Sequence, residues 1–205
     1  MEIQVLTPEG IVGIDNAVSL EDLDFIEDLI YWAIKHDVQL NRAMEDDSSM
    51  TEKENHPYNF WAIKNFSLDL YPKVFSSITR NIEARVKNLF LEYLEFVGID
   101  RNIETNLEVM QLDAVTVHRD TDEQTLGDHV DCFDYGLVLY INDVSDYEGG
   151  LFQVSETEQT ITPVKNRLLI VPSDIVHRVT PTTKGTRMVL TSFVAVGEGS
   201  MSRES

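Results

Sequence analysis

The chain has 205 residues and a formal net charge of −20, from 36 acidic and 16 basic side chains. That balance argues against a nucleic acid or an anionic membrane as partner, since both are bound through basic patches. The single cysteine excludes an internal disulfide, and no apolar run approaches the roughly 20 residues that span a bilayer, so we expect a soluble cytoplasmic protein.

Two helices are predicted in the N-terminal half. Ser19 and Asp22 form a capping signal ahead of an apolar repeat, which predicts a helix over about 20–36. A second apolar repeat predicts a helix over 72–97. Residues 38–59 are polar and have no period, which indicates a long loop between these helices.

After residue 104 the pattern changes to short strands. Runs of β-branched and aromatic residues alternate with turn signals, and the runs are LEVMQL, YGLVLYI, GLFQV, RLLIV and RMVLTSFVAV. Many short strands indicate a sandwich or barrel rather than a parallel sheet. We therefore predict one α+β domain with a mainly β core, in which 1–104 is a helical support, 105–196 is the β core and 197–205 is a flexible tail.

Candidate metal ligands occur in the stretch GDHVDCFD and after the run RLLIV. His129 and Asp131 are two residues apart, so a strand would project both to one face and Cys132 to the other. His177 offers a third ligand, whereas His56 is expected to have no such role. Two histidines and one carboxylate form the facial triad of non-haem Fe(II) enzymes, while a structural zinc site would need a fourth protein ligand.

Arg187 lies beyond His177 at the start of the last strand. An isolated arginine here would be read as an edge-strand surface residue, but in this order of residues its guanidinium is expected to clamp a carboxylate through two parallel hydrogen bonds. Strand alternation would place Thr191 on the face of Arg187, and Asn142 on the face of Tyr140. Thr191 and Asn142 are thus either contacts behind the site or ordinary strand residues.

The order His-x-Asp, then YIND…EGGLF, then HRVTP…KGTR resembles the 2-oxoglutarate/Fe(II)-dependent dioxygenases, and within them the prolyl-hydroxylase-like branch. The resemblance covers about 105–196 and implies a double-stranded β-helix, or jelly roll. It makes His129, Asp131 and His177 ligands of Fe(II). It also assigns Arg187 to the distal carboxylate of 2-oxoglutarate, and Tyr140 either to that carboxylate or to the barrel core.

The implied reaction is hydroxylation of a C–H bond by O2 and 2-oxoglutarate, with release of succinate and CO2 and with ascorbate as a candidate reductant. The branch suggests a protein or peptide side chain such as proline as substrate. A free amino acid or another small metabolite is the alternative. A non-catalytic jelly-roll module that binds metal is the alternative from another class. The sequence gives no indication of the oligomeric state.

One feature of the branch is missing from this chain. Relatives often place a tyrosine upstream of His-x-Asp, near the C1 end of 2-oxoglutarate, and this chain has none there. The open candidates for that role are Gln111, His118, Arg119 and Thr125. Segments 38–59 and 113–127 are expected to close over the substrate.

Overall fold

The computed structural model describes residues 2–35, 60–64, 72–103, 105–116, 126–131 and 133–197. The predicted loop over 38–59 lies outside these residues, and so do Cys132 and most of segment 113–127. Residues 198–205 of the predicted tail also lie outside them.

Both predicted helices are present, as α1 (Leu20–Lys35) and α2 (Pro72–Phe96). The start of α1 is capped as its sequence indicates, because Ser19 Oγ accepts a hydrogen bond from the backbone N–H of Asp22 at 3.1 Å. After α2 the backbone N–H of Ile99 donates to the carbonyl of Leu94, and Gly98 adopts a positive φ, which terminates the helix. In the part of the chain that the structure describes, no helix is long and apolar enough to cross a bilayer.

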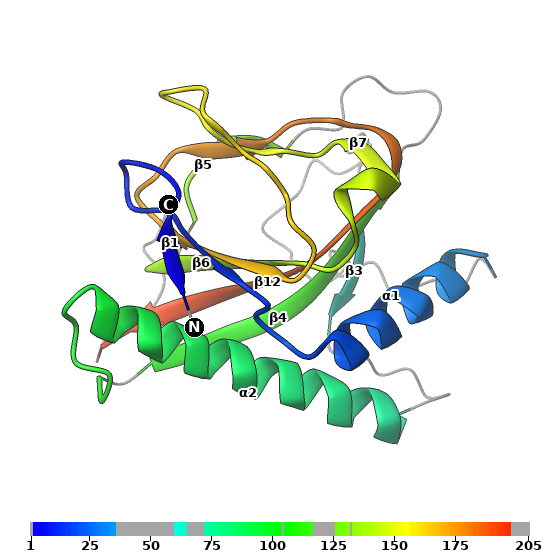
Figure 1. Ribbon diagram of the computed structural model, residues 1–205, viewed down its shortest axis with the longest axis horizontal. Helices are drawn as coiled ribbons and strands as arrows, with labels where there is room; N and C mark the ends of the chain where they lie inside the picture. Colours follow the sequence, from blue (N-terminus) through cyan, green and yellow to red (C-terminus); the bar gives the residue numbers. More distant parts are fainter. Residues whose placement is uncertain are drawn as a thin grey trace, which may run out of the picture.

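The strands form two antiparallel sheets (Figure 1). The larger sheet has the order β1 (Ile3–Val5), β2 (Val12–Asp15), β10 (Arg167–Pro172), β6 (Tyr135–Tyr140), β12 (Thr182–Val196), β4 (Thr105–Thr116) and β3 (Phe60–Lys64), with β7 (Tyr147–Gly149) paired to β12 after the 3-10 turn Val144–Asp146. The smaller sheet has the order β5 (Leu126–His129), β11 (His177–Val179), β8 (Phe152–Val154) and β9 (Thr160–Ile161). This two-sheet arrangement agrees with the predicted mainly β jelly-roll core.

The sequence predicts a helical N-terminal part, but in the structure this part is not purely helical. It also supplies β1, β2 and β3 to the larger sheet. These strands contain only three to five residues, so an alternating pattern has no length in which to develop. β2 is recognisable as a strand only from its partners, since it lies between β1 and β10.

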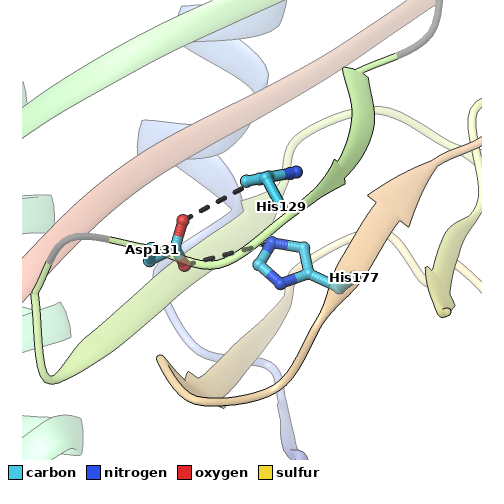
Figure 2. Close-up of side chains that lie close together, drawn as sticks. All are labelled: His129, Asp131 and His177. Carbon is cyan, nitrogen blue, oxygen red and sulfur yellow. Dashed lines mark ion pairs between the residues drawn. The ribbon is translucent and has the colours of Figure 1, made fainter. Parts of the chain in front are cut away.

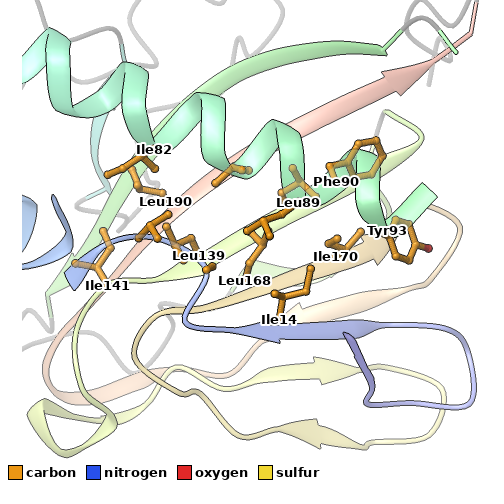
Figure 3. Packing of buried hydrophobic residues seen from close by; sticks show 14 of the residues in the cluster. Ile14, Ile82, Leu89, Phe90, Tyr93, Leu139, Ile141, Leu168, Ile170 and Leu190 are labelled. Atoms are coloured by element: carbon orange, nitrogen blue, oxygen red, sulfur yellow. The ribbon is translucent and has the colours of Figure 1, made fainter. Parts of the chain in front are cut away.

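One face of the larger sheet packs against α2. Alternate residues of β6, β10 and β12 turn toward the helix, among them Leu139, Leu168 and Leu190, and meet Leu89 and Phe90 (Figure 3). The apolar positions of α2 repeat every three or four residues, which gives the stripe that this sheet buries. The helix α2 therefore covers the face of the larger sheet that points away from the smaller sheet.

The opposite face of the larger sheet encloses a second core. Tyr140, Leu169 and Val189 turn away from α2 and pack with Phe152 and Val154 of the smaller sheet. Tyr140 belongs to this core, Arg187 lies over its ring and His177 stacks on Phe152, so these three candidate residues border the same inner space.

Candidate metal centre

The smaller sheet brings two candidate ligands together. β5 and β11 pair so that His129 lies directly opposite His177. β5 ends at His129, so Asp131 lies in the connection to β6 rather than on the strand that the sequence predicts. Val130 between them is 52% exposed.

The three side chains converge on one point (Figure 2). Asp131 lies between the imidazoles, with its Oδ1 3.9 Å from His129 Nε2 and its Oδ2 4.0 Å from His177 Nε2. One ligand atom from each residue lies within 4.8 Å of the other two, and the described residues contain one such group. These distances leave room for a cation at the centre, and the nitrogen and oxygen donors suit a first-row divalent metal.

Backbone carbonyls orient both imidazoles. His129 Nδ1 lies 2.7 Å from the carbonyl oxygen of Gly127, and His177 Nδ1 lies 2.9 Å from that of Ile175. A carbonyl only accepts, so each Nδ1 carries the proton and each Nε2 keeps its lone pair free. The His177 ring is further fixed by stacking on Phe152, with ring centroids 4.7 Å apart and an interplanar angle of 16°.

The carboxylate is held in a confined and partly desolvated place. A Cβ atom on Gly136 would overlap Asp131 Oδ2, so only glycine leaves room for the carboxylate here. Burial raises the pKa of the Asp131 carboxyl against the opposing effect of the two histidines, and burial lowers the pKa of His177. A bound divalent cation would compensate the buried carboxylate while the imidazoles remain neutral, so these residues fit a metal.

A second polar group lies on the inner face of the larger sheet. Tyr140 is paired with Val189, and Gly185 is paired with Tyr147, so Tyr140, Arg187 and Tyr147 all point to one face. All three are almost fully buried, and the Arg187 guanidinium carbon lies 5.7 Å from the centroid of the Tyr140 ring. This inner face is also the one on which the sequence places Tyr140 and Arg187.

Three atoms of this group have no hydrogen-bond partner. They are the hydroxyls of Tyr140 and Tyr147 and the Nε of Arg187, and no other buried side-chain nitrogen or oxygen of the described residues lacks one. Burying a guanidinium nitrogen and two hydroxyls without partners is unfavourable, so the group fits an anionic ligand such as a carboxylate. Tyr147 was not among the predicted site residues. Its only local signal in the sequence is its position directly before Glu-Gly-Gly, a run typical of a turn.

The remaining candidates are placed as follows. Asn142 donates from Nδ2 to the carbonyl of Thr186 at 2.8 Å and accepts at Oδ1 from the N–H of Met188 at 3.0 Å. Its amide therefore holds the backbone on both sides of Arg187. Thr191 is half-buried on β12, opposite Gln111 of β4 and Val138 of β6. The other candidates for the C1 end of 2-oxoglutarate, His118, Arg119 and Thr125, lie outside the described residues.

Comparison with known proteins agrees with this geometry. Residues 108–195 match the model of the 2OG-Fe(II) oxygenase superfamily. A PKHD-type hydroxylase of Gloeothece citriformis is 36% identical over 63 residues, which cover 30% of this chain and 29% of that protein. The chain spans less than two thirds of the length of each curated relative that we compared.

Solved structures share the fold. The viral collagen prolyl hydroxylase from Paramecium bursaria Chlorella virus-1, in its 2-oxoglutarate complex, gives a TM-score of 0.55 at 16% identity over 91% of this chain and 95% of that one. A prolyl hydroxylase from Trichoplax adhaerens, in complex with a peptide fragment of the hypoxia inducible factor oxygen degradation domain, gives 0.58 at 14% identity over 92% and 84%.

The matched segment contains the His-Asp-His group and the buried arginine, and the family implies Fe(II) and 2-oxoglutarate as cofactors. Residues 108–195 are therefore similar to a 2OG-Fe(II) oxygenase domain, and the chain shares its fold with solved prolyl hydroxylases.

Proposed function

We propose that this protein is an Fe(II)- and 2-oxoglutarate-dependent dioxygenase that hydroxylates a C–H bond in a protein or peptide side chain such as proline. One observation carries the proposal. The His129, Asp131 and His177 group and the buried Arg187, whose Nε has no hydrogen-bond partner, both border the inner core between the two sheets, through Phe152 and Tyr140 respectively. A metal-binding module without catalysis has no use for such a cation, whereas a dicarboxylate cosubstrate does.

In this proposal His129, Asp131 and His177 hold Fe(II), and Arg187 binds the distal carboxylate of 2-oxoglutarate. When bound, the metal and cosubstrate supply the oxidising power that the side chains of the protein lack. Three protein ligands leave coordination positions open for the small molecules. We infer succinate and CO2 as the co-products, and ascorbate as the reductant that maintains the iron.

The surrounding protein contributes orientation and the exclusion of water. The carbonyls of Gly127 and Ile175 keep the protons of both imidazoles away from the metal position. Asp131, over Gly136, completes the third corner of the group. His177 is 5% exposed, so bulk water has little access to that side of the site.

The substrate class is supported by what the related proteins are. Hydroxylases are among the curated relatives, and the Trichoplax adhaerens prolyl hydroxylase with the same fold holds a peptide. The net charge of −20 suits a neutral or basic substrate segment. A free amino acid or another small metabolite is the competing substrate class.

Mass spectrometry and succinate release test the activity together. The purified protein is incubated with Fe(II), 2-oxoglutarate, ascorbate and either proline-containing peptides or free amino acids. We expect succinate and a product heavier by one oxygen atom with a peptide, and neither with the Asp131→Ala variant. Hydroxylation of free amino acids but not of peptides would show that the substrate is a small metabolite. Succinate formation that Asp131→Ala retains would exclude the proposed site.

A further inference from the structure

Tyr147 lies beside the candidate cosubstrate site, in a segment whose sequence is typical of a turn. The 3-10 turn Val144–Asp146 is capped by Asp143, whose carboxylate accepts from the N–H of Ser145 at 2.8 Å. β7 follows at once and pairs with β12, with Tyr147 opposite Gly185. Because Gly185 and Arg187 share a face of β12, this register directs the Tyr147 ring toward the guanidinium.

The hydroxyl of Tyr147 is buried but unpaired. Tyr147 is 4% exposed, and its oxygen has no hydrogen-bond partner among the described residues. A tyrosine that belonged only to the apolar core would normally reach a backbone or side-chain acceptor. Tyr140 Oη and Arg187 Nε, in the same polar group, also have no hydrogen-bond partner.

The segment that carries Tyr147 also limits the space around the Arg187 side chain. Gly150 follows β7 and has a φ of 63°, and a Cβ atom there would lie 2.6 Å from Arg187 Cδ and 2.9 Å from Thr182 Oγ1. The stem of the arginine therefore passes directly over the glycine. The segment Tyr147–Gly150 thus both positions the guanidinium and brings a second phenol beside it.

We propose that Tyr147 is a further binding residue for the distal carboxylate of 2-oxoglutarate, acting with Arg187 and Tyr140. This inference rests on the proposed function, because it takes 2-oxoglutarate as the ligand. One guanidinium and two phenols then surround the carboxylate, so each of the three unpaired groups donates to one of its oxygens.

The protonation of the phenol is compatible with that role. Burial raises the pKa of Tyr147 to about 12, with Arg187 opposing the effect, and burial also raises the pKa of Tyr140. Both hydroxyls are therefore protonated donors at neutral pH. A carboxylate that accepts from them and from Arg187 keeps its negative charge.

Titration calorimetry on Mn(II)-loaded protein tests the inference without turnover. The ligands are 2-oxoglutarate and 2-oxopentanoate, which has the same chain length but carries a methyl group in place of the distal carboxylate. The variants are Tyr147→Phe, which removes only the hydroxyl, and Tyr93→Phe as the matched control. Tyr93 is a residue of α2, is 3% exposed and packs in the other core, between that helix and the larger sheet.

We expect Tyr147→Phe to weaken 2-oxoglutarate binding by about 10-fold or more, the loss typical of a hydrogen bond to a charged group. Binding of 2-oxopentanoate should not change in Tyr147→Phe, and Tyr93→Phe should bind both ligands like the wild type. The melting temperature of unliganded Tyr147→Phe should stay equal or rise, because an unpaired hydroxyl is removed.

Wild-type affinity for 2-oxoglutarate in the Tyr147→Phe variant would overturn the inference and leave the proposed function intact. Equal weakening of both ligands together with a lower melting temperature would show a structural role and would also overturn it. A wild-type protein that does not distinguish the two ligands would instead overturn the proposed function.

Discussion

His129 lies directly opposite His177 in the antiparallel pair of β5 and β11, and the centroids of their rings are 4.3 Å apart. Two candidate ligands that are far apart in the sequence are thus held in register by the backbone hydrogen bonds of the smaller sheet. Only Asp131 stands outside a strand, in the connection between β5 and β6. The candidate metal centre therefore depends on the pairing of two short strands and on the space kept for one carboxylate.

Gly136→Ala should weaken metal binding while the protein still folds. The added methyl group would occupy the position of Asp131 Oδ2, so the carboxylate must move away from the histidines. We expect Mn(II) affinity, measured by calorimetry, to fall at least about 10-fold, as is typical when a metal site is disturbed. Gly127→Ala is the control, because a Cβ there meets nothing within 4 Å. Equal affinities in the two variants would contradict the geometry described for Asp131.

Gly150→Ala should affect 2-oxoglutarate binding and leave metal binding unchanged. The new Cβ would collide with the stem of Arg187 and displace its guanidinium. Gly98→Ala carries the same kind of backbone strain, since its φ is 82°, but has nothing within 4 Å. Both variants should lose roughly 1 kcal/mol of stability from that strain. Only Gly150→Ala should weaken the binding of 2-oxoglutarate. Loss of affinity for 2-oxoglutarate in both variants would point to a general effect on the fold.

Asn142→Ala should destabilise the protein through the backbone of β12. The side chain is 1% exposed and bonds to both Thr186 and Met188, so alanine leaves a buried carbonyl and a buried N–H unpaired. We expect a loss of about 1–3 kcal/mol in the free energy of unfolding, measured by urea denaturation. Asn102→Ala, at an exposed position, should change stability by less than about 0.5 kcal/mol. Similar small losses in both variants would show that the Asn142 hydrogen bonds contribute little.

Acid should remove the contribution of the Asp15–Arg167 pair to stability. Arg167 donates to both oxygens of Asp15, at 2.6 and 2.8 Å, and these hydrogen bonds hold the pKa of Asp15 below its usual value of 3.8. The stabilisation is therefore complete above the unfolded-state pKa and is lost as the pH falls through the lower folded-state pKa.

Asp15→Asn should accordingly cost about 1 kcal/mol at pH 7, a modest value because the pair is partly exposed. The difference from wild type should shrink as the pH falls below about 4, the range in which aspartates titrate. Urea denaturation across this range measures it. A difference that grows on acidification would contradict the assigned direction of the pKa shift.

The sequence predicts the site better than it predicts the periphery of the fold. His129, Asp131 and His177 could be predicted as one group because their order along the chain matches a known pattern, and the structure brings them together. Alternation predicts only which residues share a face with Tyr140 and with Arg187. The strand β2 could not be found in this way, since its four residues show no alternation when both faces are buried. Tyr147 was not predicted because its proposed role depends on the pairing of β7 with β12, a contact between segments that the local sequence does not encode.

Anaerobic absorption spectroscopy tests the central claim most directly. Fe(II) and 2-oxoglutarate are added to the protein without O2, and the weak visible charge-transfer band of the iron–cosubstrate chelate is measured. We expect the band in the wild type and in His56→Ala, which removes a histidine not assigned to the site, and no band in His177→Ala. If the wild type gives no band, or if the band persists unchanged in His177→Ala, the proposed iron and 2-oxoglutarate site is wrong.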